Sequence, residues 1–294
     1  MIPTPQSTAE ALPDVHHLQC MEIWGGHGGT FDAVSARGMD AWVYSKPYAG
    51  NTLGGDIHYL SACASGRILR VALADVSGHG ETVSAVAETL RRLMRKSINT
   101  ANQARFAQQI NQAFMGESDG GLFATAVLGT YWAPTQTFLF VNAGHPRPLI
   151  SRAGGPWSVL CASSGGVTRT GKAAAGLSNL PLGVIGDTGY EQLAVQLEVD
   201  DRLLLYTDFA IEARSPEGRE LGEDGLVALL DGLSSGDEAL ITELLAGVRA
   251  HAGVDELNDD ATVVLLRHNA SPMPPQTFGD RMRTLSRLIG IASV

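Results

Sequence analysis

Aspartates stand at or near the ends of apolar segments at four places in this chain. Asp56 follows two glycines, Asp75 ends the run ILRVALA, and Asp208 follows the run LLLYT. At the fourth place, the pair Asp259 and Asp260 precedes the apolar run ATVVLL. Because strands end in loops and loops favour aspartate, each position taken alone has an ordinary explanation. Four such positions together indicate a shared site, provided that the strands belong to one sandwich and their ends converge.

Carboxylates gathered in one cleft require divalent cations. They repel one another, which raises their pKa values unless cations neutralise them. Hard oxygen ligands select Mg²⁺ or Mn²⁺ over Zn²⁺, and the sequence has no Cys/His cluster at zinc spacing. Two ions roughly 3.5 to 4 Å apart can hold a water, lower its pKa toward neutrality and stabilise an in-line displacement at phosphorus. The aspartates therefore predict a two-metal site that hydrolyses phosphate monoesters without a covalent intermediate.

Apolar spacing predicts the strands that position these aspartates. After a first strand at 40–48, two strands joined by a turn at 64–66 form a hairpin that carries Asp56 and Asp75. Between residues 122 and 160, short apolar runs at hairpin spacing predict a meander of antiparallel strands. His58 is expected on the outward side of its strand.

Two stretches rich in small residues are predicted to be a loop and a turn. The stretch 161–180 is rich in Gly, Ala and Ser without periodicity and predicts a long loop. GGHGGT at 25–30 lacks the strand and helix context of a phosphate-binding loop, so we read it as a turn.

Helices are expected in two pairs. The fourth helix carries a capping box of Ser235 and Glu238. Because the helices come in pairs instead of alternating singly with strands, a doubly wound parallel sheet is disfavoured. The pattern favours an α+β fold of two antiparallel sheets with helix pairs outside them. The expected helices span 81–98, 103–115, 223–231 and 237–250.

Composition excludes several classes of protein. The 294 residues carry a formal net charge of -10, which argues against a nucleic-acid partner. No apolar run approaches the roughly 18 residues needed to span a bilayer. The three cysteines indicate no disulfide framework, so we expect a cytoplasmic protein. We divide the chain into a flexible lead-in at 1–17, one domain at 18–268, and a tail at 269–294 whose apolar residues suit an amphipathic helix.

The chain resembles the metal-dependent protein phosphatase (PPM) family, in its bacterial SpoIIE-like branch that includes the RsbU-type sigma-factor regulators. The resemblance covers about residues 40 to 268, with the motifs in the family's order. It implies a four-layer α-β-β-α sandwich and hydrolysis of phosphoserine or phosphothreonine in proteins, often phosphorylated anti-sigma-factor antagonists. The motifs are LGGD at 53–56, ADVSGHG at 74–80, FATAVLG at 123–129, NAGHPRPLI at 142–150, PLGV at 181–184, LLLYTDFAIEA at 203–213 and NDDATVVLLR at 258–267.

The family motifs also imply roles for individual residues. Asp260 is expected behind the metal ligands instead of among them. His79 has two interpretations, as a general acid for the leaving oxygen or as a structural polar residue at the start of a helix. His145 is expected to hold its loop near the cleft, with direct substrate contact as the alternative. The implied ligands of two Mn²⁺ or Mg²⁺ ions are Asp56, Asp75, Asp208, Asp259 and the backbone carbonyl of Val76.

Two motif positions depart from the family pattern. Tyr59 stands where a second acid is common, which puts a water-mediated metal contact in doubt. Phe209 and Ala210 follow Asp208 where glycine is usual, and a large side chain there would narrow the cleft.

Three functions fit these residues. The leading one is an active serine/threonine protein phosphatase, because every implied metal-ligand position is intact. A pseudophosphatase that binds a regulator without hydrolysis is the alternative that the two departures support. A hydrolase of small phosphorylated metabolites or nucleotides would share the metal chemistry, but the sequence has no Walker-type loop or Rossmann glycine pattern.

Overall fold

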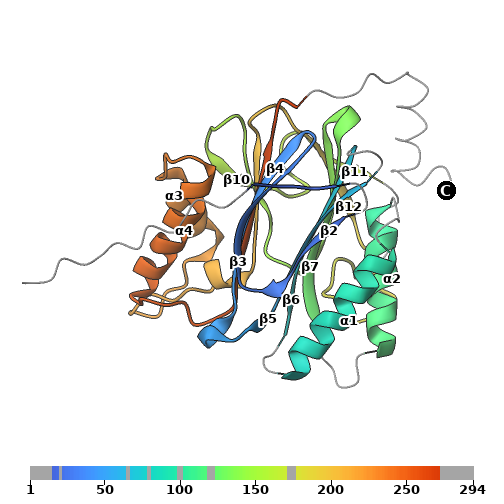
Figure 1. The fold of residues 1–294 in the computed structure, drawn as a ribbon. Helices are drawn as coiled ribbons and strands as arrows, with labels where there is room; N and C mark the ends of the chain where they lie inside the picture. Colours follow the sequence, from blue (N-terminus) through green and yellow to red (C-terminus); the bar gives the residue numbers. More distant parts are fainter. Residues whose placement is uncertain are drawn as a thin grey trace, which may run out of the picture.

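Two seven-stranded β-sheets lie face to face in the computed structural model, with a helix pair outside each sheet (Figure 1). The model describes residues 15–19, 22–63, 67–77, 81–97, 102–117, 123–170 and 177–271. The arrangement confirms the predicted α+β class with two antiparallel sheets. The expected amphipathic helix of the tail and His79 lie outside the described residues.

Sheet A joins the start of the described chain to its last strand. All its strand pairs are antiparallel except β1 with β3. Residues 15–17, which we placed in the lead-in, form its edge strand. In spatial order the strands are β1 (Val15–His17), β3 (Thr30–Ala36), β4 (Met39–Lys46), β14 (Ala261–His268), β13 (Arg202–Tyr206), β9 (Leu149–Ser151) and β10 (Trp157–Val159).

Sheet B is antiparallel throughout and contains the predicted hairpin as β5 and β6. In spatial order its strands are β11 (Val167–Thr170), β12 (Gln192–Gln196), β8 (Thr137–Ala143), β7 (Ala124–Trp132), β6 (Ile68–Val76), β5 (Leu53–Cys63) and β2 (Ile23–Gly28).

Two of the expected connections are partly strands. The stretch 25–30 is no turn, because strand β2 runs to Gly28 and β3 begins at Thr30. Glycine suits this edge: Gly25 has φ +114°, and a Cβ there would lie 2.2 Å from the His58 carbonyl oxygen. Within the expected loop 161–180, β11 pairs with β12 at the edge of sheet B. Main-chain pairing at a sheet edge requires little apolar periodicity, so the sequence pattern missed both strands.

The helices confirm the predicted pairs and correct one cap. No side chain caps α4, whose N-cap residue is Gly236, and the Ser235 hydroxyl donates to Glu243 instead of closing a capping box with Glu238. No helix in the described ranges is both long and apolar enough to cross a membrane. The helices are α1 (Glu81–Ser97), α2 (Gln103–Glu117), α3 (Gly222–Asp231) and α4 (Asp237–Ala252), and short 3₁₀ turns are η1 (Tyr48–Gly50), η2 (Ala133–Thr135) and η3 (Asp208–Ala210).

Three apolar layers hold the sandwich together. Between the sheets, Val43 and Val264 of sheet A pack with Leu73 of sheet B in one buried cluster. A second cluster joins the outer face of sheet B to α1 and α2, and a third joins sheet A to α3 and α4. Successive strand residues point to opposite faces, so each strand contributes to two layers. Burial on both faces keeps the strand ends, where the aspartates lie, in fixed positions.

Candidate metal centre

Asp56 and Asp75 lie directly opposite each other on neighbouring strands of sheet B. Their Cα positions are register partners in the antiparallel pair of β5 and β6. Opposite residues in such a pair point to the same face, with Cβ atoms about 4.5 to 5.5 Å apart. Like charges in this position are destabilising unless a cation separates them.

Sheet A brings Asp208 and Asp259 to the same end of the sandwich. Asp208 opens η3 two residues after β13 ends, and Asp259 lies two residues before β14 begins. Tyr206 of β13 is paired with Val263 of β14, so the end of one strand lies beside the start of the other. The four predicted carboxylates therefore come in pairs from the two sheets.

A hydrogen bond between the sheets orients the Asp56 carboxylate. The Thr207 hydroxyl donates to Oδ2 of Asp56 at 2.8 Å, and the Thr262 amide donates to the Thr207 hydroxyl oxygen at 3.1 Å. Asp56 is only 3% exposed, so this bond holds its carboxylate below the surface of the cleft. Thr207 was not singled out from the sequence, because the residue meets Asp56 only through the packing of the two sheets.

Asp260 binds backbone groups, as its expected place behind the metal ligands requires. Its carboxylate accepts from the amide nitrogens of Tyr48 and Gly55, each at 2.6 Å. A Cβ at Gly54 would lie 2.7 Å from the same carboxylate, which explains why the motif before Asp56 contains a glycine. Asp260 thereby ties the start of β14 to the start of β5, one residue from Asp56.

An open cleft of about 510 Å³ runs between the ends of the two sheets. Asp75, Asp208 and Asp259 all contribute to its walls, and Asp56 lies beneath them. Its other lining residues are Val76, Ser77, Phe123, Thr125, Gly144, His145, Pro146, Ile211 and Glu212.

The pKa values of these carboxyl groups are raised, which shows how unfavourable their charges are together. Burial, followed by the charges of Asp208, Asp259, Asp260 and Glu212, raises the pKa of Asp75 to about 7. Burial and the charges of Asp259 and Glu212 raise the pKa of Asp208 to about 6.

The other two carboxyl groups follow the same trend. Burial, followed by the charge of Asp75, raises the pKa of Asp56 well above its ordinary value. Burial also raises the pKa of Asp259. The charged groups that raise these pKa values are all carboxylates, so the donor set fits hard divalent cations.

The carboxylates surround the cleft without closing on one point. Among the described residues, no three His, Cys, Asp or Glu side chains already lie in position to hold a single ion. Asp75, Asp208 and Asp259 thus line one cleft, each at a separate point of its wall.

Glu212 is a further acid in the cleft that the sequence analysis missed. It lines the cleft, and its charge contributes to the raised pKa values of both Asp75 and Asp208. The amide of Glu212 donates to the Asp208 carbonyl oxygen at 2.9 Å, which closes one helical turn. The spacing of four residues was the available signal, since residues i and i+4 share one face of such a turn.

Neither motif departure affects the cleft. Tyr59 is three residues from Asp56 on β5, so the two side chains point to opposite faces of the sheet. The Tyr59 ring packs toward α1, where the Arg91 guanidinium lies 5.3 Å from its centroid. Phe209 is 4% exposed and packs in the cluster beneath α3 and α4, and it does not line the cleft. The expectation that Phe209 narrows the cleft is therefore wrong.

The two histidines of this region are buried. His58 is 2% exposed, so the outward orientation that we expected is wrong: both faces of β5 are covered, and the His58 ring lies 5.7 Å from that of Trp24. His145 lines the cleft, and its Nδ1 is 2.8 Å from the Thr125 hydroxyl oxygen. Its backbone amide donates to Oδ1 of Asn142, as a loop-holding residue would, and burial lowers the pKa of its imidazole to about 3.

Solved structures show which class of protein has this fold. A structure of the RsbU and RsbW domains of a Mycobacterium tuberculosis protein is 25% identical, with a TM-score of 0.64 over 87% of this chain and 71% of that one. The PP2C phosphatase domain of SpoIIE from Bacillus subtilis is 17% identical, with a TM-score of 0.64 over 85% of this chain and 71% of that one. The fold is that of the PP2C-type protein phosphatases.

The likeness extends to a phosphatase solved with metal. The catalytic domain of the serine/threonine protein phosphatase PstP, in complex with two manganese ions, is 15% identical, with a TM-score of 0.52 over 79% of this chain and 98% of that one.

Sequence comparison identifies the family. The model of the Stage II sporulation protein E (SpoIIE) family matches residues 65–269, and the chain belongs to this family. Stage II sporulation protein E of Priestia megaterium is 22% identical over 243 residues, which cover 82% of this chain. The match spans 38% of that relative's own length.

Proposed function

We propose that this protein is a metal-dependent phosphatase that hydrolyses phosphoserine or phosphothreonine in a protein substrate. The observation that carries the proposal is the convergence of Asp56 and Asp75 from one sheet with Asp208 and Asp259 from the other. Membership of the SpoIIE family and the phosphatase fold support the same activity.

The carboxylates are proposed to hold two Mn²⁺ or Mg²⁺ ions, with the Val76 carbonyl as a further ligand. When bound, such ions supply Lewis-acid stabilisation to the phosphate oxygens and activate water for in-line attack. The protein's own groups prepare the site: Thr207 orients Asp56, and Asp260 fixes the backbone at Gly55. Because its pKa is about 7, Asp75 loses a proton when ions bind near neutral pH, whereas Asp208, with a pKa of about 6, does so mainly below neutral pH.

His79 remains our candidate for donating a proton to the leaving oxygen. His145 is less suited to this role, because burial keeps its imidazole neutral at physiological pH. We assign His145 to holding the loop 142–146 against the cleft.

The substrate that we propose is a phosphorylated regulatory protein of the anti-sigma-factor antagonist type, in a cytoplasmic partner-switching pathway. The structural relative with RsbU and RsbW domains supports this choice, as does the acidic chain, which does not suit a nucleic-acid partner. The pseudophosphatase alternative loses its support, because Tyr59 and Phe209 lie outside the cleft.

Phosphate release tests the activity. The wild type, Asp75→Asn and the surface control Asp224→Asn would each be assayed on p-nitrophenyl phosphate and a phosphoprotein mixture, in EDTA and then with Mn²⁺. We expect wild type and control to be active only with metal, and Asp75→Asn to lose more than about a hundredfold of that activity. A folded, metal-supplied wild type that releases no phosphate would refute the proposal.

A further inference from the structure

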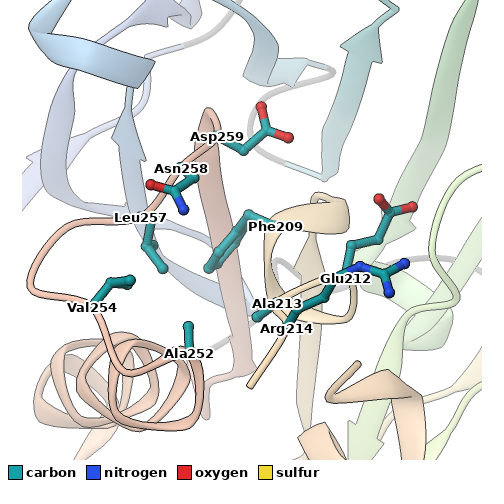
Figure 2. A pocket seen from close by; sticks show the side chains of 9 residues that line it. All are labelled: Phe209, Glu212, Ala213, Arg214, Ala252, Val254, Leu257, Asn258 and Asp259. Atoms are coloured by element: carbon teal, nitrogen blue, oxygen red, sulfur yellow. The ribbon is translucent and has the colours of Figure 1, made fainter. Parts of the chain in front are cut away.

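A second pocket shares walls with the metal-binding cleft. It has a volume of about 280 Å³ and lies between η3, the end of α4 and the segment before β14 (Figure 2). Asp259 and Glu212 line both this pocket and the cleft. The other lining residues of this flanking pocket are Phe209, Ala213, Arg214, Ala252, Val254, Leu257 and Asn258.

The shared residues place their carboxylates on the cleft side. Figure 2 shows the carboxylates of Asp259 and Glu212 turned away from the side chains of Ala252 and Leu257. The two acids therefore form a partition, with charged ends toward the metal ligands and their backbone toward the flanking pocket. Because the two pockets share these walls and an extended peptide advances about 3.3 Å per residue, the flanking pocket is within reach of the residues next to a phosphorylated residue in the cleft.

Of the seven other lining residues, five are apolar, and Arg214 and Asn258 are polar. Phe209 belongs to the buried cluster under α3 and α4, and Ala213 and Leu257 pack against the same cluster. Ala252 and Val254 complete the apolar wall from the end of α4. Pockets that bind side chains or small ligands combine such an apolar lining with a few polar groups at the edge.

The charges around the flanking pocket disfavour an acidic occupant. Arg214 pairs with Glu220 and donates to the Gly218 carbonyl oxygen at 3.4 Å, so its positive charge is partly offset at the solvent-exposed edge of the pocket. Glu212 and Asp259 add negative charge at the partition. An acidic side chain would meet repulsion, whereas an aliphatic one would bury its surface on Phe209 and Leu257.

We propose that the flanking pocket is a specificity subsite that receives an aliphatic side chain close to the phosphorylated residue of the protein substrate. This inference rests on the proposed phosphatase activity and names the sequence that the phosphatase prefers. The apolar residues of the flanking pocket do not line the cleft, so changes to them act on substrate affinity and leave hydrolysis of a small phosphate ester intact.

Phosphoserine peptides provide the first test. A parent peptide would carry alanine on both sides of the phosphoserine, and variants would place leucine or glutamate at each nearby position in turn. With Mn²⁺ present, we expect leucine at one position to raise kcat/KM roughly tenfold over alanine, mainly through KM, and glutamate at that position to lower it. Equal kcat/KM for all peptides, by an enzyme active on p-nitrophenyl phosphate, would overturn the subsite but not the phosphatase.

Filling the pocket provides the second test. Ala252→Leu places additional carbons in the pocket, and Ala250→Leu makes the same change at an exposed position of the same helix. We expect Ala252→Leu to abolish the leucine preference and Ala250→Leu to retain it, with both variants keeping wild-type activity on p-nitrophenyl phosphate. Leu257→Ala, which enlarges the pocket, should weaken the same preference and provides the test if Ala252→Leu does not fold. A preference that survives both changes would assign it to another surface and refute the inference.

Discussion

At the residue scale, a few side chains from distant parts of the sequence hold the aspartates of the cleft in place. Thr207 lies 151 residues from Asp56 in the sequence, yet its hydroxyl donates to the Asp56 carboxylate. Likewise, the Asp260 carboxylate accepts a hydrogen bond from the Gly55 amide, 205 residues away in the sequence. Such supporting bonds fix the direction in which a ligand oxygen points, and metal affinity depends on that direction.

Thr207→Val tests the orienting bond at Asp56. Valine keeps the shape of threonine but cannot donate, so the buried carboxylate loses one of the hydrogen bonds that orient it and keeps that of Thr262. We expect Mn²⁺ affinity, measured by isothermal titration calorimetry, to fall by about 10- to 100-fold. Thr207→Ser keeps the hydroxyl and should remain near wild type. Unchanged affinity in the valine variant would show that this bond does not support the metal site.

At the element scale, ion pairs fix the helix that borders the flanking pocket. Asp237, in the first turn of α4, accepts from Arg202 Nε at 2.6 Å and from Arg267 Nη1 at 2.5 Å. These arginines come from β13 and β14, the two strands whose ends carry Asp208 and Asp259. The Asp237 side chain is 4% exposed, so water screens these bonds little. The pairs thus attach α4 to the strands that position Asp208 and Asp259, two of the four proposed metal ligands.

Asp237→Asn tests this attachment. The neutral amide cannot compensate the two guanidinium groups, so we expect unfolding free energy from urea titration to fall by about 2 to 3 kcal/mol. Glu238→Gln, the next residue of the same helical turn, loses only its interaction with the helix dipole and should cost less than about 1 kcal/mol. Equal effects of the two changes would indicate that α4 is held by its apolar face alone.

At the scale of the whole molecule, the carboxylates of the cleft oppose folding unless ions neutralise them. An aspartate in the unfolded chain titrates near its ordinary value of about 3.9, whereas Asp75 titrates at about 7 and Asp208 at about 6 in the fold. Between about pH 3.9 and about pH 7, these two aspartates therefore bind more protons in the folded protein than in the unfolded chain. Stability contributed by these groups therefore falls as pH rises through that window.

Thermal unfolding of metal-free protein tests this linkage. Burial lowers the pKa of His145 to about 3, so this residue makes the protein more stable as pH rises toward about 6.5, the opposite of the aspartates. The informative quantity is therefore the difference in Tm between wild type and Asp75→Asn, in which the contribution of His145 cancels. We expect this variant to gain Tm relative to metal-free wild type on going from about pH 5 to about pH 8. Mn²⁺ should raise the Tm of the wild type more at the higher pH. A difference independent of pH would contradict the raised pKa of Asp75.

The sequence by itself determined the four helices, the central hairpin and the positions of the aspartates relative to the strands. Apolar periodicity predicted the four helices and the hairpin of β5 and β6, because burial of one face imposes a regular spacing. The positions of Asp56, Asp75, Asp208 and Asp259 at strand ends predicted a site where strands converge. These features are local, so they can be predicted without knowing which strands become neighbours.

Only the tertiary structure decided which groups meet. The bond from Thr207 to Asp56 and the carboxylate of Glu212 in the cleft depend on how two sheets pack, and no local pattern encodes that packing. The same holds for Tyr59 and Phe209, whose departures from the family pattern are harmless because each side chain points into an apolar layer. The flanking pocket likewise exists only because the end of α4 and the segment before β14 approach η3, far apart in sequence but adjacent in the fold.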